Sequence, residues 1–246
     1  MSLNVKKCNC ITFHRIKSAI IFDYKLDNIP LTRCESIRDL GVMLAQDLRP
    51  NLHIQNVCAK ASRSLGLLAR SSRDFDDLNS LRTLYCTLVR PLLEYNSVVW
   101  SPHQITLVRE LQTIQDRFLR LLGCRMGFAF REVPIRDLEP LFNLQSLEVR
   151  RDVSGVVFLH KLVNGFVDCP ELLGQIGFLC RTGTRSTDLF GRRHVSTNYD
   201  ANSTLNRIQR LGNKASHHID FFADSSTSVK RSLLRVATDE LYSLRQ

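Results

Sequence analysis

Two adjacent carboxylates, Asp76 and Asp77, are the first residues of this chain to consider for chemistry. Paired aspartates can hold the metal ions of a catalytic site. This pair, however, stands directly before a helical pattern that starts at Leu78, where a carboxylate caps the first backbone N–H groups. We therefore expect Asp76 or Asp77 to be a helix N-cap, and we predict no metal site here.

Cysteines and histidines are numerous but do not form a metal-binding pattern. The eight cysteines are scattered, and several stand at apolar positions of expected helices, so we expect reduced, buried thiols. Cys8 and Cys10 are too close together for a zinc-ligand pair, and His217 and His218 have no acidic partner at ligand spacing. A nucleophile-elbow pattern and a glycine-rich phosphate loop are also missing from the sequence. No catalytic residue is predicted from these side chains.

Basic residues suggest a different chemistry. The chain has 34 Lys and Arg against 24 Asp and Glu, a net charge of +10, which favours polyanions such as nucleic acid or an anionic membrane surface. At about 100° per residue, Lys60, Arg63 and Arg70 fall on one side of a helix expected from Asn51, opposite an apolar side. Such a face suits phosphate groups, and an ordinary solvated face is the alternative.

The elements that would position these residues begin with β structure. Alternation at 11–15, β-branched and aromatic residues at 19–26, and the extended unit 36–44 predict short strands. Gly41 is expected to provide a bulge or a close backbone approach. These residues are too few for a domain, so we expect the edge of a larger sheet.

Helical periodicity follows over most of the remaining chain. Helices are predicted over 51–70, 78–95 with a break near Pro91, 105–123, 144–163, 204–222 and near the C-terminus. The second helix is indicated by apolar residues at mixed three and four spacing: Leu78, Leu81, Leu84, Tyr85, Leu88, Leu92 and Tyr95. A linker with two prolines is expected at 127–140 and irregular structure at 165–204. The predicted fold class is mainly α with a short N-terminal β-hairpin region, or α+β overall.

Five segments, taken in order, resemble the downstream half of the reverse transcriptase, an RNA-directed DNA polymerase, of jockey-type retrotransposons that lack long terminal repeats. They are LNVKKCNCITFHR, ESIRDLGVML, LRTLYCTLVRPLLEYNSVVWSP, IQDRFLRLL and LQSLEVRRDVSGVVFLHKLVNG. The later stretch LNRIQRLGNKASHHIDFF is similar to the tail of that family. The resemblance covers nearly the whole chain.

The resemblance implies three regions with different roles. The end of the palm would occupy 1–48, a helical thumb 49–130, and a helical C-terminal segment 131–246. Leu40, Gly41 and Val42 would form the primer grip, a hairpin that holds the end of the primer. The closest match to the palm lysine that assists the leaving pyrophosphate is Lys7.

The same resemblance implies which chemistry lies elsewhere. The catalytic aspartates of the family, which bind Mg²⁺ in the full-length polymerase, precede the primer grip, so the chain alone would bind no cofactor and have no polymerase activity. The segment RDFDDLN is no substitute, because it follows the grip and lacks the spacer residue of the catalytic turn. The expected partners are an RNA–DNA hybrid or duplex, held by Lys60, Arg63 and Arg70, and the missing upstream palm and fingers region.

Two other functions remain open from the sequence. A chain separated from its palm would expose apolar surface, which favours a non-enzymatic helical interaction module or a self-associating relic of a mobile element. Binding to an anionic membrane is less favoured, because the basic faces lack flanking Trp and Phe. The longest apolar runs are far below the roughly 20 residues of a membrane span, so we expect a soluble protein of the cytoplasm and nucleus.

Overall fold

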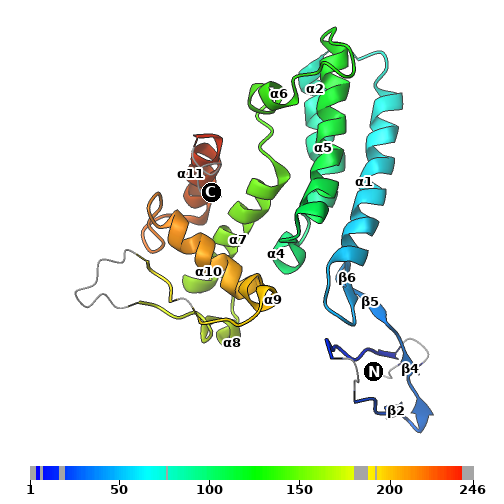
Figure 1. The fold of residues 1–246 in the computed structure, drawn as a ribbon, viewed down its shortest axis with the longest axis vertical. Helices are drawn as coiled ribbons and strands as arrows, with labels where there is room; N and C mark the ends of the chain where they lie inside the picture. The colour runs from blue at the N-terminus through cyan, green and yellow to red at the C-terminus, as the bar shows by residue number, and fades with distance from the viewer. Residues whose placement is uncertain are drawn as a thin grey trace. The chain divides into compact units, whose positions relative to one another are not determined.

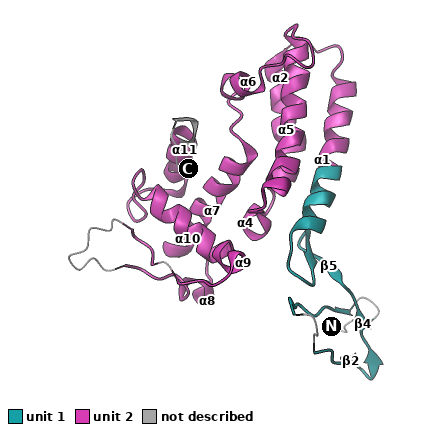
Figure 2. Ribbon diagram, viewed as in Figure 1, with its two compact units in different colours: residues 1–59 teal, residues 60–246 magenta. Residues whose placement is uncertain are grey.

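The computed structural model describes residues 4–5, 8–16, 20–75, 77–179, 188–191 and 193–239 (Figure 1). It is mainly helical, and its named strands all lie before residue 46, which confirms the predicted fold class. The chain divides into an N-terminal unit, residues 1–59, and a C-terminal unit, residues 60–246 (Figure 2). The three functional regions implied by the resemblance stay a prediction.

The strands of the N-terminal unit form three separate two-stranded sheets. Their bounds are β1 Asn9–Cys10, β2 Lys25–Leu26, β3 Ile29–Pro30, β4 Thr32–Arg33, β5 Ser36–Asp39 and β6 Val42–Ala45. β1 pairs with β4 in parallel, whereas β2–β3 and β5–β6 are antiparallel hairpins. The strand expected at 11–15 is wrong, and the strand expected at 19–26 is reduced to its last two residues.

The β2–β3 hairpin shows how the local sequence makes these short elements. Its two loop residues, Asp27 and Asn28, have φ values of 51° and 62°. Their short polar side chains tolerate this left-handed conformation, which a two-residue hairpin turn requires. The turn chemistry of this stretch was therefore readable from the sequence, although the strands beside it are shorter than expected.

Helix α1, Asn51–Ser71, separates its side chains into two faces as predicted. The apolar residues expected to share one side are all buried: Ile54, Val57, Cys58, Ala61, Leu65 and Leu68. The polar residues expected on the other side are all exposed: Asn56, Lys60, Arg63 and Arg70. Burial of the apolar side thus leaves the basic side facing solvent.

The remaining helices belong to the C-terminal unit. They are α2 Leu78–Leu84, the π-helical turn η2 Tyr85–Val89, α3 Arg90–Glu94, α4 Ser97–Trp100, α5 Ile105–Arg125, α6 Ile135–Leu141, α7 Leu147–Val163, α8 Pro170–Leu173, α9 Asn198–Ala201, α10 Thr204–Ala215 and α11 Ser226–Asp239. The stop predicted at Asn164 and Gly165 is confirmed at the end of α7. The expected linker 127–140 contains α6, and the helix expected over 204–222 ends at Ala215.

Pro91 breaks the second predicted helix in a specific way. The chain widens into the π-helical turn η2 directly before the proline, and Arg90 donates its N–H to the carbonyl of Tyr85. Because a π turn adds one residue, the buried stripe shifts to Val89 and Leu93. Leu88 and Tyr95, which belong to the same spacing in the sequence, are therefore 52% and 59% exposed.

Aromatic and charged contacts hold the C-terminal unit together. The buried Tyr85 ring stacks on Phe118 of α5, with ring centroids 4.2 Å apart, and the Tyr85 hydroxyl donates to Gln115. Burial raises the pKa of Tyr85, so its hydroxyl stays protonated. Arg150 of α7 forms a two-pronged ion pair with Glu94 of α3. These contacts join helices that are far apart in the sequence.

The last helices form a second packed region of this unit. α7 packs against α10 and α11, and their apolar side chains enclose Phe190 and Phe221. The buried Asn213 of α10 fixes the preceding loop, because its amide accepts the N–H groups of Leu189 and Phe190 and donates to the Phe190 carbonyl. An irregular segment is thus anchored by one side chain.

Candidate nucleic-acid interface

The predicted primer grip forms the tight turn of the β5–β6 hairpin. Asp39 pairs with Val42, which leaves Leu40 and Gly41 as a two-residue loop. Both have left-handed backbones, with φ of 42° and 88°. This conformation suits Gly41 but strains a leucine. Gly41 therefore shapes a turn, so the bulge expected for it is wrong, and the close backbone approach stays a prediction.

The three predicted grip residues have different surroundings. The Leu40 side chain is 81% exposed, whereas Val42 is buried at 3%. Within the same unit, the Met43 N–H donates to Nδ1 of the buried His53, 3.1 Å away, in the first turn of α1. This bond fixes the base of the hairpin to the start of α1 and leaves Leu40 as an apolar tip on a strained backbone.

The basic face of α1 consists of Lys60, Arg63 and Arg70, which all lie in the C-terminal unit. Between Lys60 and Arg70 the helix rises about 15 Å, and one strand of a duplex carries a phosphate every ~3.4 Å along its axis. Within the described part of the chain, none of the three cations belongs to a salt bridge. They are therefore available to an external anion.

Two sets of hydrogen bonds hold the part of α1 that carries Lys60, Arg63 and Arg70 in place. Ser64 donates its hydroxyl to the Leu88 carbonyl of η2 at 3.1 Å. At the carboxyl end of α1, the Arg125 guanidinium donates to the carbonyls of Ser72 and Arg73 at 2.9 Å and 2.6 Å. Arg125 thus caps a helix end, a role that its position in the sequence did not indicate. The basic face is supported from η2 and from the end of α5.

The carboxylate of Asp77 is engaged by backbone and side-chain donors, as expected of an N-cap. Its two oxygens accept the N–H groups of Asn79 and Ser80 at 3.0 Å and the Ser80 hydroxyl at 2.6 Å. These hydrogen bonds, the Ser80 hydroxyl first, lower the pKa of Asp77. The N-cap prediction is confirmed at Asp77, while Asp76 and Lys7 lie outside the described residues.

A pair of carboxylates lies half-buried between α5 and α6. The amide of Gln112 donates to Asp116 at 3.1 Å and to Glu139 at 3.0 Å. Burial raises the pKa of both groups, and the nearby Asp116 raises that of Glu139 further, against the hydrogen bonds from glutamine. This cluster joins two helices, and the sequence did not indicate it because α6 was expected to be a linker.

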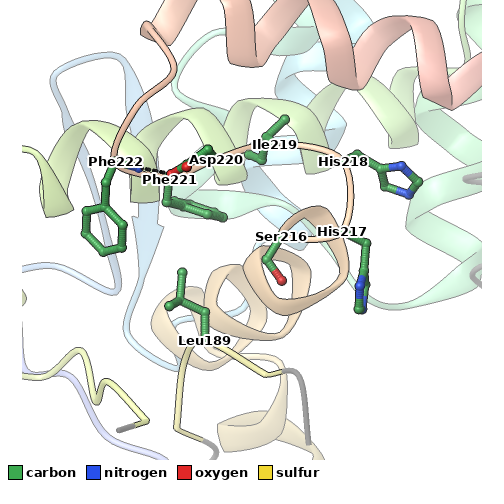
Figure 3. Close-up of a pocket in the computed structure, with 8 residues that line it drawn as sticks. All are labelled: Leu189, Ser216, His217, His218, Ile219, Asp220, Phe221 and Phe222. Atoms are coloured by element: carbon green, nitrogen blue, oxygen red, sulfur yellow. Dashed lines mark hydrogen bonds between the residues drawn. The ribbon is translucent and has the colours of Figure 1, made fainter. Parts of the chain in front are cut away.

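An open pocket of about 490 Å³ lies beside the turn after α10 (Figure 3). His217 and His218 line it, but their side chains point in different directions. The Asp220 carboxylate accepts the N–H groups of Phe222 and Ala223 and so closes its own turn. These three side chains do not converge on a common point, and the described residues contain no group of three potential metal ligands.

The cysteines of the described ranges are free thiols. Of these, Cys58 is buried, Cys124 is exposed and the others are partly covered. The expectation of general burial is therefore wrong, and the reduced state of the thiols stays a prediction.

No protein-family model, curated protein or solved structure matches this chain. Across the part of the chain that is described, no helix combines the length and apolar character needed to cross a membrane. The family resemblance therefore stays a prediction that rests on the sequence segments alone.

Proposed function

We propose that this chain grips duplex nucleic acid through phosphate contacts, as the end of the palm, the thumb and the C-terminal segment of a retrotransposon RNA-directed DNA polymerase. The observation that carries the proposal is the exposed row of Lys60, Arg63 and Arg70 on α1. Their charges are not used in salt bridges within the described ranges. Phosphate contacts are independent of base sequence, which suits a protein that follows a moving duplex.

The hairpin tip supports the same proposal from the N-terminal unit. Leu40 keeps an apolar side chain in solvent on a left-handed backbone, and such strain often marks a functional position. In the proposed role, Leu40 and Gly41 contact the sugar–phosphate backbone at the primer end, and Val42 anchors the hairpin. Mg²⁺ and the catalytic aspartates would belong to the upstream palm, and this chain would supply duplex binding alone.

The test is a fluorescence-anisotropy titration of the purified chain with a short blunt RNA–DNA hybrid at several salt concentrations. The proposal predicts binding whose logarithmic affinity falls linearly with the logarithm of salt concentration. It also predicts no nucleotide incorporation by the chain alone. A folded chain that fails to bind the hybrid at low salt would refute the grip.

A protein-interaction function is the second candidate, favoured by the apolar surface of the N-terminal unit. Ile20, Ile21 and Phe22 are between 64% and 91% exposed, and apolar groups gathered in this way favour a protein partner. Light scattering with and without the hybrid separates the two functions. A nucleic-acid grip predicts a complex of chain and hybrid, whereas a self-associating module predicts a larger particle that the hybrid leaves unchanged.

A further inference from the structure

The loop after α5 exposes large apolar side chains beside arginines. Met126 and Phe128 are each 41% exposed, and Phe130 is 64% exposed. All belong to the C-terminal unit, at the end of the helix whose last arginine caps α1. These three side chains take no part in the duplex grip proposed above.

The helix end explains why Phe128 stays uncovered. Gly127 has φ of 95°, and the N–H of Phe128 donates to the Gly123 carbonyl at 3.0 Å. In this Schellman arrangement the residue in the Phe128 position usually packs on a side chain at the Gly123 position. Gly123 has no side chain, and any Cβ there would overlap Val133. Phe128 therefore has no side chain at the Gly123 position to pack on, and it is 41% exposed.

Phe130 is held beside a cation. The guanidinium carbon of Arg120 lies 5.6 Å from the centre of the Phe130 ring. The next turn is closed by the Glu132 N–H, which donates to the Ala129 carbonyl at 2.8 Å. Arg120 can cover one face of the ring, and the 64% exposure of Phe130 leaves further ring surface in solvent.

The local charge selects the kind of ligand. From Arg117 to Asp137 the chain carries five arginines and two acidic residues, and the flanking Asp116 and Glu139 are half-buried carboxylates whose pKa burial raises. One of the five, Arg125, is occupied by the carbonyls at the end of α1. Aromatic rings beside arginines suit single-stranded nucleic acid, because every base has a flat face and every nucleotide carries a phosphate. A partner protein would need matching acidic and apolar groups together.

We propose that Phe128 and Phe130, with Arg120, form a stacking platform for unpaired bases of single-stranded nucleic acid. This rests on the proposed nucleic-acid function and adds a second ligand class, because duplex bases are stacked on one another and offer no free faces except at the ends. Base stacking on such rings tolerates any sequence. The platform would therefore hold a strand of any sequence next to the duplex that α1 grips.

The test compares binding of a labelled oligouridylate and of a blunt RNA–DNA hybrid to the full chain. For the double variant Phe128→Ala, Phe130→Ala, affinity for the single strand should fall by about fivefold to a hundredfold for each base that is stacked, with hybrid affinity unchanged. Phe130→Trp should retain single-strand binding, whereas Phe130→Leu should weaken it, by less than the double variant does. Because both rings are exposed, circular dichroism should show an unchanged fold.

The matched control is Phe166→Ala, which removes a ring of 70% exposure in the loop after α7 and should leave both affinities unchanged. Single-strand binding that is absent, or unaffected by the double variant, would overturn the platform. A double variant that loses self-association alone would also overturn it, because the rings would then serve a protein interface. If the wild-type chain binds the hybrid but no single strand, the proposed duplex grip stands and the stacking platform is refuted. If it binds the single strand but not the hybrid, the duplex grip is refuted.

Discussion

The strand region of the N-terminal unit and the helices of the C-terminal unit differ in how far their apolar side chains are buried. In the N-terminal unit, Ile20, Phe22 and Ile29 are more than half exposed, and the strands are two to four residues long. In the C-terminal unit, Phe118, Leu119 and Leu122 are completely buried in α5 alone. Apolar side chains of the same types are thus left in solvent at 20–29 of the N-terminal unit and enclosed within α5 of the C-terminal unit.

This difference indicates where each unit obtains its stability. Two-stranded sheets are marginal in water unless another element covers them. Packed helices with interlocking side chains, such as those joined by Glu94 and Arg150, support one another. Under the proposed function, the upstream palm would cover the exposed residues of the N-terminal unit, and the C-terminal unit would fold on its own contacts.

The largest expected effect tests the contrast between the two units. Phe118→Ala removes a fully buried ring that stacks on Tyr85 and should lower the free energy of unfolding by about 3–5 kcal/mol. Phe22→Ala removes a ring that is 64% exposed and should change it by less than about 0.5 kcal/mol. Urea unfolding followed by circular dichroism measures both. Similar losses in the two variants would mean that Phe22 is covered after all.

A second experiment compares two helical glycines of the C-terminal unit, one closely packed and one with room for a Cβ beside it. A Cβ on Gly123 would overlap Val133, so Gly123→Ala should destabilise the chain by about 1–3 kcal/mol. A Cβ on Gly66 of α1 would lie 3.5 Å from Nη1 of Arg70, an ordinary contact. Gly66→Ala should therefore stabilise the chain by about 0.5–1 kcal/mol. Thermal unfolding of both variants shows whether each change in stability is a gain or a loss. A gain in both or a loss in both would contradict the packing described.

Relief of the backbone strain at the hairpin tip should stabilise the N-terminal unit by a smaller amount. Asparagine adopts the left-handed backbone more readily than leucine, so Leu40→Asn should stabilise the β5–β6 hairpin by about 1 kcal/mol. Hydrogen exchange at the hairpin amides should become slower by a matching factor. Gly41→Ala is the opposite variant, since φ of 88° strains an alanine, and it should speed exchange. Faster exchange in Leu40→Asn would disprove the strain.

The half-buried carboxylates predict a pH effect in the C-terminal unit. Burial, and secondly the charge of Asp116, raises the pKa of Glu139, so the folded state binds more protons than the unfolded state. The contribution of Glu139 to stability should therefore fall as the pH rises from below the ordinary value of 4.5 through the raised pKa. Glu139→Gln should reduce this fall and make the chain more stable than wild type at neutral pH. If the free energy of unfolding depends on pH in the same way in wild type and in Glu139→Gln, the raised pKa of Glu139 is contradicted.

The sequence predicted the elements whose signals are local. The two faces of α1, the N-cap at Asp77 and the stop after α7 all depend on residues within a few positions of each other. The exposed basic face of α1 was therefore found from helical spacing alone. Leu40 and Gly41 were located by the resemblance, and their turn conformation was missed because leucine is uncommon at a left-handed position.

The features that the sequence did not predict depend on long-range contacts. The π-helical turn before Pro91 shifted the buried stripe by one residue, which a uniform helical period cannot reproduce. The helix expected to stop at Gly123 continues to Arg125 and is followed by the left-handed Gly127, because Gly123 packs closely against Val133 inside the helix. Arg125 caps α1 from more than fifty positions away, and no local pattern marks that contact.

The most direct test of the central claim is the salt dependence of hybrid binding in two triple-alanine variants. One replaces Lys60, Arg63 and Arg70, and the other replaces the equally exposed Lys161, Lys230 and Arg231, which removes the same charge. The proposal predicts that the first variant binds more weakly and that its slope of log affinity against log salt is shallower by about 3. The second should keep nearly the wild-type slope. Equal slopes in the two variants would show that the basic face of α1 does not hold the phosphates.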